Sequence, residues 1–489
     1  MATDRPAVRI ALALALVWGL QTSGALAAGP ADFGPQAPLA EPVGGYVGRM
    51  AVLPSHGQTG TMVRVEASGL PANDEVDLVW RTMRGEWKVR DGEYHGRAYQ
   101  PIAYRIARLR ADASGKLSAQ FTAPDDFGFG HDVVLQKGER LYTQANFNID
   151  MSVEVSPKSG PLGTPIEITM KGIGWRELEN SWTLSYDNAF TGWISAVTTQ
   201  GTARFTIPAT GAPGLHSIAF IHGEFTFPYL NPEQNPRPDR PRFTETFNIT
   251  PGAPVLPPPV EAQLQKRIKD APAPGSLMAQ PALGPIKTPI TVSGEGFKPG
   301  QSYGLEWASM SGNRVGGGGF GDVGRKIAEA KADASGKLSF AFEAPDDLGG
   351  AHRLSVKADD TTREGWFTTL ASAHPLNVAQ GPAGTPFKVH LKGVGWTETA
   401  NIFTLVYDNV YAGYACGFNS QGDIEIFLRA SGAPGWHYID LYPAIYKGKE
   451  VRPNNFRIPQ LTYADDHPGE DLPAFHFAFK VTEASAPSR

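Results

Sequence analysis

The sequence is nearly free of cysteine: Cys416 is the only one among its 489 residues. An intrachain disulfide is therefore impossible, and the fold has to be stabilised by its own hydrophobic cores. The chain also lacks an excess of basic residues, since its formal net charge is −5. This balance argues against the broad basic surface of nucleic-acid-binding proteins. We therefore expect no nucleic-acid partner.

Beyond the N-terminus there is no apolar run of about 18 residues, which a membrane-spanning helix needs. The N-terminus itself is typical of a secretory signal peptide. Arg5 and Arg9 precede an eleven-residue apolar run over 10–20 and the small-residue site Ala25–Ala27. That run is too short for an uncleaved membrane anchor. We predict a signal peptide over 1–28 and a mature protein exported to the periplasm or the extracellular space, without an integral membrane segment.

Common enzyme signatures are missing as well. The chain has no His-Glu-x-x-His, no Gly-x-Ser-x-Gly and no paired cysteines that could bind a metal. We therefore predict no catalytic residues and no cofactor. The two carboxylates of a glycoside hydrolase are brought together in space rather than in sequence, so an enzyme of that kind stays an open alternative.

Glycine and proline, in contrast, are abundant: 55 Gly and 41 Pro residues make up just under a fifth of the chain. This content disfavours a helical bundle, whose helices such residues interrupt. Many of them recur in an internal duplication. Residues 111–131 match residues 332–352 at 15 of 21 positions, and residues 163–216 match residues 384–437 at 23 of 54, both at an offset of 221. The chain is thus a tandem duplication of one long unit.

Each unit contains a further repeated outline, in which a glycine turn and an alternating strand lead to a proline and a late Gly-x-His. Segments such as 62–67 and 387–391 alternate between apolar and polar residues, as strands with one buried face do. We predict an all-β fold of four tandem immunoglobulin-like β-sandwich modules in the order A–B–A′–B′, a duplicated pair. The predicted boundaries are 29–47 for an irregular lead-in, 48–150 for A, 151–250 for B, 251–276 for a linker, 277–375 for A′ and 376–485 for B′.

The predicted linker is rich in proline at 251–259 and 271–275, which favours an extended chain. Between these stretches, Val260, Leu264 and Ile268 recur at four-residue spacing and predict a short helix. We expect this semi-rigid linker to hold the two pairs of modules apart.

The stretch 284–307 (GPIKTPITVSGEGFKPGQSYGLEW), followed by Ala344-Pro345 and Ala351-His352, resembles bacterial extracytoplasmic immunoglobulin-like modules of the IPT/TIG kind. The resemblance covers most of residues 48–485 and implies an immunoglobulin-like fold. Such modules are similar to parts of adhesins, accessory regions of secreted enzymes and cell-surface scaffolds. Modules B and B′ depart from the pattern with a Tyr-Asp-Asn strand end and long late insertions, so the resemblance implies fold more than function.

The insertion after Trp80 is the first candidate for ligand binding, because basic and aromatic groups on one loop suit a sugar or an anionic glycan. A long solvated hairpin explains the same residues. The candidates here are Trp87, Arg90, Tyr94 and Tyr99. The equivalent loop of A′ is a glycine run over 316–319, which lacks the Lys-Ser/Thr of a phosphate loop.

The duplicated Tyr-Asp-Asn motif is the second candidate, and it comprises Tyr186, Asp187 and Asn188 in B and Tyr407, Asp408 and Asn409 in B′. Its polar groups suit a ligand, but Asp-Asn also suits a tight turn because both residues tolerate left-handed backbone.

The late insertion of B′ is a third candidate, because it carries the acidic residues Asp465, Asp466, Glu470 and Asp471 beside His467. Several converging oxygen ligands can bind a divalent cation such as Ca²⁺. The spacing fits no calcium-loop pattern, and a hydrated acidic loop explains it equally.

Two further features receive structural interpretations. The histidines His131, His216, His352 and His437 occupy one equivalent position in the four modules, where an imidazole can hydrogen-bond back to the chain as the corner tyrosine of immunoglobulin domains does. Cys416 aligns with Ser195 and has no His or Asn partner nearby, which indicates a buried free thiol rather than a nucleophile.

Taken together, these features predict an exported, non-enzymatic binding or scaffold protein. We expect it to recognise a cell-surface or extracellular glycan or protein through its loop insertions, because loops vary while the sheets hold their positions. A secreted hydrolase or lyase acting on polysaccharide is one alternative. A surface protein that assembles through exposed strand edges is another.

Overall fold

The computed structural model describes residues 33–484, apart from 177–178, 225–226, 235–240, 266–267, 269–271, 313–318, 448–455 and 470. The predicted signal peptide lies outside these residues. In the described part, eight sheets pair into four sandwiches, and two short 3-10 helices accompany them. The predicted all-β fold of tandem immunoglobulin-like modules is confirmed. Among the described residues, no helix is long and apolar enough to cross a membrane.

The four sandwiches share one topology. In each, a sheet of three strands faces a larger sheet, and a short second strand pairs in parallel with the last strand of the module. Module A consists of β1 (Arg49–Leu53), β2 (His56–Gly57), β3 (Met62–Ser68), β4 (Glu75–Arg90), β5 (Glu93–Arg110), β6 (Leu117–Thr122), β7 (Phe129–Lys137) and β8 (Arg140–Ile149). Its sheets have the orders β1-β3-β6 and β2-β8-β7-β4-β5.

Module B repeats this plan with sheets β14-β11-β9 and β10-β17-β15-β12-β13, and β16 adds to β15. Its elements are β9 (Ser152–Ser156), β10 (Ser159–Gly160), β11 (Pro165–Lys171), β12 (Trp182–Tyr186), β13 (Ala189–Ile194), β14 (Ala203–Pro208), β15 (Gly214–Glu224), β16 (Phe227–Pro228), the 3-10 helix η1 (Pro232–Gln234) and β17 (Phe243–Ile249).

Module A′ has sheets β18-β20-β23 and β19-β25-β24-β21-β22. Its strands are β18 (Met278–Gln280), β19 (Leu283–Gly284), β20 (Pro289–Gly294), β21 (Ser302–Gly312), β22 (Phe320–Lys331), β23 (Leu338–Glu343), β24 (Gly350–Ala358) and β25 (Thr361–Thr369).

Module B′ has sheets β26-β28-β31 and β27-β33-β32-β29-β30. Its strands are β26 (Ser372–His374), β27 (Gln380–Pro382), β28 (Pro386–Lys392), β29 (Ile402–Tyr407), β30 (Val410–Cys416), β31 (Ile424–Arg429), β32 (Gly435–Pro443) and β33 (Phe475–Thr482). Because β26 pairs with β28, the module begins a few residues before the predicted position 376.

The alternation that predicts the strands also builds the cores. In β3, Val63, Val65 and Ala67 are buried while the residues between them are exposed. The inward side chains of the two facing sheets then form one apolar cluster in each module, and such burial contributes about 25 cal/mol per Å² of apolar surface.

Modules A and B are joined by a buried polar network that is repeated between A′ and B′. The Asp126 carboxylate accepts from Trp80 Nε1 at 2.7 Å within A and from Gln200 Nε2 of B at 3.0 Å. In the second pair, Asp347 accepts from Trp307 Nε1 at 2.9 Å and from Gln421 Nε2 of B′ at 2.8 Å. Both aspartates are fully buried, so these hydrogen bonds fix each junction without competition from water.

A pair of glycines brings the backbones together at each junction. A Cβ atom on Gly128 would lie 1.7 Å from the carbonyl oxygen of Gly172, and one on Gly349 would lie 1.9 Å from that of Gly393. The repeated sequence Pro-Asp-Asp-x-Gly therefore supplies both the buried carboxylate and the close approach of the two modules.

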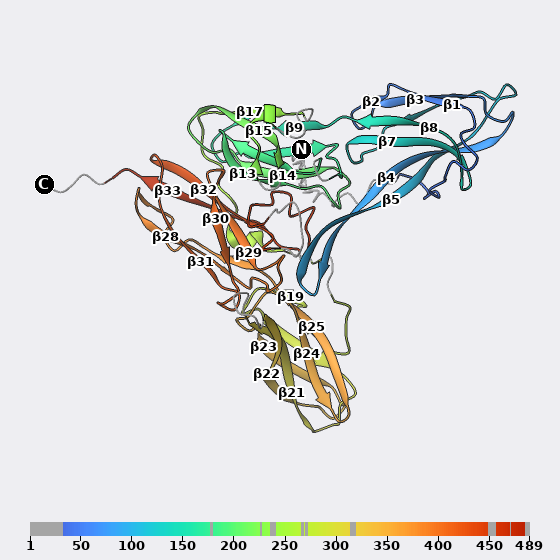
Figure 1. Ribbon diagram of the computed structural model, residues 1–489. Coiled ribbons are helices and arrows are strands. Elements are labelled where there is room, and N and C mark those ends of the chain that lie inside the picture. The colour runs from blue at the N-terminus through green and yellow to red at the C-terminus, as the bar shows by residue number, and fades with distance from the viewer. Residues whose placement is uncertain are drawn as a thin grey trace, which may run out of the picture.

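The linker does not hold the two pairs apart, contrary to expectation. Modules B and B′ contact each other directly, and Val406, Tyr442 and Leu461 of B′ pack into the core of B (Figure 1). The predicted helix is a single 3-10 turn, η2 (Val260–Gln263), which ends because Leu264 adopts an extended conformation. Val260 is buried in the core of B′, so packing fixes the linker.

The described part of the lead-in, residues 33–47, is packed against module A. Gln36 forms a bridge to Tyr104 of β5, and Ala37 and Ala40 are buried against Val79 and Val134 on the outer face of the five-stranded sheet. In A′ the position of Val134 is taken by Ser355, which leaves that face polar.

We predict that Gly349→Ala destabilises the protein by about 1–3 kcal/mol, because its Cβ would force the A′–B′ junction apart. Urea denaturation measures this effect. Gly324→Ala is the control, since a Cβ there meets nothing within 4 Å. Equal stability of the two variants would show that the junction adapts freely.

Candidate functional site

The candidate residues of module A lie on a long hairpin formed by β4 and β5, which extends from A towards the centre of the molecule (Figure 1). Asp91 and Gly92 form its two-residue turn, both with positive φ. Asp-Gly is a strong sequence signal for such a turn, and the sequence prediction did not use it. At the tip, the carbonyl oxygen of Gly92 accepts from the Glu398 backbone N–H of B′ at 2.7 Å.

Three aromatic residues of this hairpin, Trp87, Tyr94 and Tyr99, contact modules B or B′. Tyr94 is 2% exposed and packs with Trp193 of B and with Ile445 and Ile458 of B′. Its backbone N–H donates to Glu398 Oε2 at 3.0 Å, and burial raises the pKa of its phenol to about 12. Trp87 meets Trp193 edge to face at a centroid distance of 6.1 Å.

The two other residues of this group differ in exposure. The Tyr99 hydroxyl accepts from Asn180 Nδ2 of B at 3.1 Å, and burial raises its pKa. Arg90 is exposed near the tip. The structure thus shows an arm that docks module A onto B and B′, with most of its aromatic surface inside the molecule.

The late insertion of B′ forms a strap, defined here as residues 456–469, that covers the edge strand β13 of module B. The backbone N–H of Trp193 donates to the carbonyl oxygen of Pro459 at 2.7 Å, and the backbone N–H of Leu461 donates to the carbonyl oxygen of Trp193 at 2.9 Å. Because these bonds continue the sheet, the strap covers an edge that other chains could otherwise join.

Asp466, the central acidic residue of the strap, is fully buried and accepts four hydrogen bonds from other segments. The donors are the backbone N–H groups of Val197 and Thr198 and the hydroxyl of Thr198, each at 2.8 Å, and Trp87 Nε1 at 2.9 Å. One carboxylate therefore joins the strap, the hairpin arm and module B.

The remaining acidic residues of the insertion do not gather around Asp466. Asp471 pairs with His467 at 2.8 Å, while Asp465 is exposed. Partial desolvation of the Asp465 carboxyl nevertheless raises its pKa. Glu470 lies outside the described residues. Among those described, no group of three or more His, Cys, Asp or Glu side chains is placed to hold a metal ion.

The Tyr-Asp-Asn motifs form corners and turns. The Tyr186 hydroxyl donates to the carbonyl oxygen of Thr210 at 2.9 Å, and that of Tyr407 donates to Ser431 at the same distance. Burial raises the pKa of both phenols. The Asp and Asn of each motif have positive φ, as a two-residue hairpin turn requires.

The two asparagines have different environments despite the duplication. Asn188 is exposed, whereas Asn409 is fully buried at the contact between B′ and B. Asn409 Nδ2 donates to the carbonyl oxygen of Pro208 at 2.8 Å and to Thr210 Oγ1 at 2.9 Å. The same motif therefore serves as a solvent-facing turn in B and as a contact between modules in B′.

The four equivalent histidines form hydrogen bonds with the backbone of their own modules, as predicted. Each Nε2 lies 2.7–2.9 Å from the carbonyl oxygen four residues earlier. In B and B′ the other nitrogen pairs with the turn aspartate, as His437 does with Asp408 at 2.5 Å. That hydrogen bond raises the pKa of His437.

Cys416 is partly buried, and burial raises the pKa of its thiol to about 11, which makes it a poor nucleophile at neutral pH.

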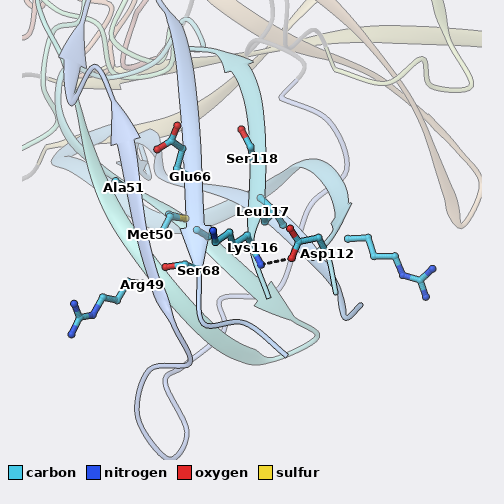
Figure 2. Close-up of a pocket in the computed structure, with 11 residues that line it drawn as sticks. Arg49, Met50, Ala51, Glu66, Ser68, Asp112, Lys116, Leu117 and Ser118 are labelled. Atoms are coloured by element: carbon cyan, nitrogen blue, oxygen red, sulfur yellow. Dashed lines mark hydrogen bonds between the residues drawn. The ribbon is translucent and has the colours of Figure 1, made fainter. Parts of the chain in front are cut away.

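A hollow lies on the outer face of β1, β3 and β6 in module A. We call it the basic hollow; it has a volume of about 650 Å³ and is lined by Arg49, Met50, Ala51, Glu66, Ala67, Ser68, Arg110, Asp112, Lys116, Leu117 and Ser118. Figure 2 shows Lys116 lying across it. Hydrogen bonds from the backbone of Lys116 and from Ser114 lower the pKa of Asp112, whose carboxylate is thus occupied by its own turn. Sequence reasoning did not find this surface, because its residues come from separate strands.

Comparisons with known proteins do not assign this chain to a family. No family model matches the chain, and no curated protein sequence matches it. Among solved structures, a Salmonella alpha-2-macroglobulin matches 87% of this chain at 12% identity with a TM-score of 0.18, and the chain spans 30% of that protein's length. The ICAM-5 ectodomain fragment matches 85% of this chain and 99% of its own at 11% identity, with a TM-score of 0.16.

A putative membrane anchored protein from Corynebacterium diphtheriae matches 66% of this chain and 89% of its own at 11% identity, with a TM-score of 0.17. These TM-scores are low, so the fold assignment rests on the strand pairing described above.

We predict that Asp466→Ala lowers the free energy of unfolding by about 2–4 kcal/mol, because it leaves buried donors of module B and Trp87 without an acceptor. Chemical denaturation measures the loss. The neighbouring exposed Asp465→Ala is the control. If both variants are as stable as the wild type, Asp466 does not join these segments.

We also predict a pH dependence from His437. Because its pKa is raised in the folded state, its stabilising contribution is present below its ordinary pKa of about 6.5 and is lost as the pH rises through the higher folded value. The stability difference between wild type and His437→Gln should therefore shrink from about pH 6 to pH 9. Asp408→Asn should remove the same dependence, and a constant difference across this range would contradict the assignment.

Proposed function

We propose that this is an exported binding or scaffold protein that recognises a cell-surface or extracellular glycan or protein. The main support for this proposal is that the loop insertions of the chain hold its modules together. The hairpin arm and the strap, which vary between the two copies, connect A, B and B′ through buried contacts. The chain therefore builds a rigid frame from which A and A′ extend in different directions (Figure 1). A fixed frame of this kind suits the presentation of binding surfaces.

Export and the IPT/TIG-like character of the modules belong to the same proposal, and they are supported by the N-terminal sequence and by the glycine and proline pattern of residues 284–307. The single cysteine is consistent with a fold that needs no disulfide in any compartment.

The basic hollow is the surface we assign to recognition. Arg49, Arg110 and Lys116 line the hollow beside a floor of small residues, Ala51 and Ser68 among them, and Glu66 and Asp112 share this lining. The Arg49 side chain extends outward from this floor (Figure 2). Cations around such a floor suit a carboxylated sugar polymer, whose acid groups accept charge-assisted hydrogen bonds while the chain lies along the sheet. An acidic glycan is therefore the ligand class that this surface favours.

We expect the protein to bind a polyuronate more tightly than the same polymer with its carboxyl groups reduced. Replacing Arg49 and Lys116 by Ala should weaken binding by about five- to tenfold, because charge-assisted hydrogen bonds are lost. Surface plasmon resonance at several salt concentrations measures this. Lys337→Ala, at the position of Lys116 in A′, is the control.

Two outcomes would contradict the proposal. Failure to bind any acidic or neutral glycan or any isolated surface protein would remove the binding function. The release of new reducing ends from the polymer would indicate the enzymatic alternative instead.

A further inference from the structure

A second cavity, independent of the proposed function, lies where module B, the linker and module B′ meet. It has a volume of about 170 Å³. Its walls come from the end of β14 (Ile207), from the linker (Leu256, Pro257), and from β32 (Tyr438, Asp440) and β33 (His476) of B′. The cavity is smaller than the roughly 300 Å³ of a site for a drug-sized ligand, so it suits a small compound.

The polar wall of this cavity holds a buried carboxylate that is only half satisfied. Asp440 is 2% exposed, and its Oδ1 atom accepts from His476 Nδ1 at 2.7 Å. Its Oδ2 atom is buried and has no hydrogen-bond partner. The hydroxyl of Tyr442, two residues further along the same face of β32, is also buried without a partner. Leaving such groups unsatisfied costs about 1–3 kcal/mol each.

These groups belong to B′ alone. In the strand pair β32–β33, Asp440 lies opposite His476. In the equivalent pair of module B, β15–β17, Ala219 lies opposite Thr244. The fold therefore does not require a carboxylate at this position, because the duplicate module forms the same sheet without one. Its presence in a cavity points to a ligand.

The residues that line the cavity indicate which class of ligand it would bind. The carboxylate attracts a cation, and the only other ionisable groups that line the cavity are His476, which is paired with Asp440, and the Tyr438 phenol. The Tyr438 hydroxyl donates to the carbonyl oxygen of Val255 at 2.7 Å, and this bond holds the linker over the cavity. Proline, leucine, isoleucine and valine residues form the rest of the wall together with Gly163 and Thr206, and the apolar side chains among them suit an alkyl chain.

We propose that this cavity binds a small primary alkylammonium compound. The ammonium group donates to the free Oδ2 atom of Asp440, and the alkyl chain lies against Ile207, Leu256 and Pro257. The Tyr438 ring beside the carboxylate adds an aromatic surface of the kind that cations favour.

Isothermal titration with n-butylammonium tests the proposal, with n-butanol as the neutral probe of the same length. We expect binding of the amine and none of the alcohol. Asp440→Asn should weaken amine binding by about tenfold or more, because a charge-assisted hydrogen bond is lost. Asp187→Asn is the matched control, since Asp187 forms an equivalent carboxylate–histidine pair, at 2.6 Å, outside the cavity.

Leu256→Trp tests the site without touching the carboxylate, because Leu256 is 45% exposed on the linker and a larger side chain there fills the cavity. It should abolish amine binding while the thermal unfolding temperature stays unchanged. This variant decides the question if Asp440→Asn does not fold.

Titration with a lysine-containing tripeptide separates a free amine from a lysine side chain of a partner. The proposal expects butylammonium to bind and the tripeptide, which is too large for a cavity of about 170 Å³, not to bind. Absence of butylammonium binding to the wild type, or undiminished binding to folded Leu256→Trp, would overturn it.

Discussion

The buried hydrogen bond between an aspartate of one module and a glutamine of the next is the constraint on which the rest of this structure depends. Asp126 with Gln200, and Asp347 with Gln421, occur at the same place in the two copies. Each aspartate also accepts from the core tryptophan of its own module, so the bond connects one hydrophobic core to the neighbouring module. Because these groups are shielded from water, the angle between the modules of each pair is fixed.

The duplication then supplies two rigid pairs, and the differences between the copies join them. The hairpin of A is longer than that of A′, and the strap exists in B′ where B has a proline-rich segment. Asp466 brings both insertions together by accepting from the hairpin tryptophan and from module B. The larger sheets of the four modules end in equivalent edge strands, and other segments of the chain contact three of these: β5, β13 and β30. The fourth edge strand, β22, carries charged residues such as Lys326. Covered or charged edges limit pairing with other chains.

Sequence reasoning was most successful where the cause is local. Alternation in segments such as 62–67 predicted the strands, the offset of 221 predicted the repeated modules, and the late histidines were recognised as corners. The linker was predicted less well. Spacing at Val260 and Leu264 predicted a helix, but the structure has a single 3-10 turn because the chain is pulled into the core of B′.

By itself, the sequence determined the fold class, the number and order of the modules and the turn chemistry, because these follow from periodicity and from glycine and proline within short segments. Only the tertiary structure decided what the unusual residues do. Tyr94, Asn409 and Asp466 have the composition of a binding surface, yet their partners lie some 200 to 380 residues away in sequence. The basic hollow and the Asp440 cavity likewise combine separate strands. Contacts of this kind depend on how modules pack, which no local pattern in one sequence encodes.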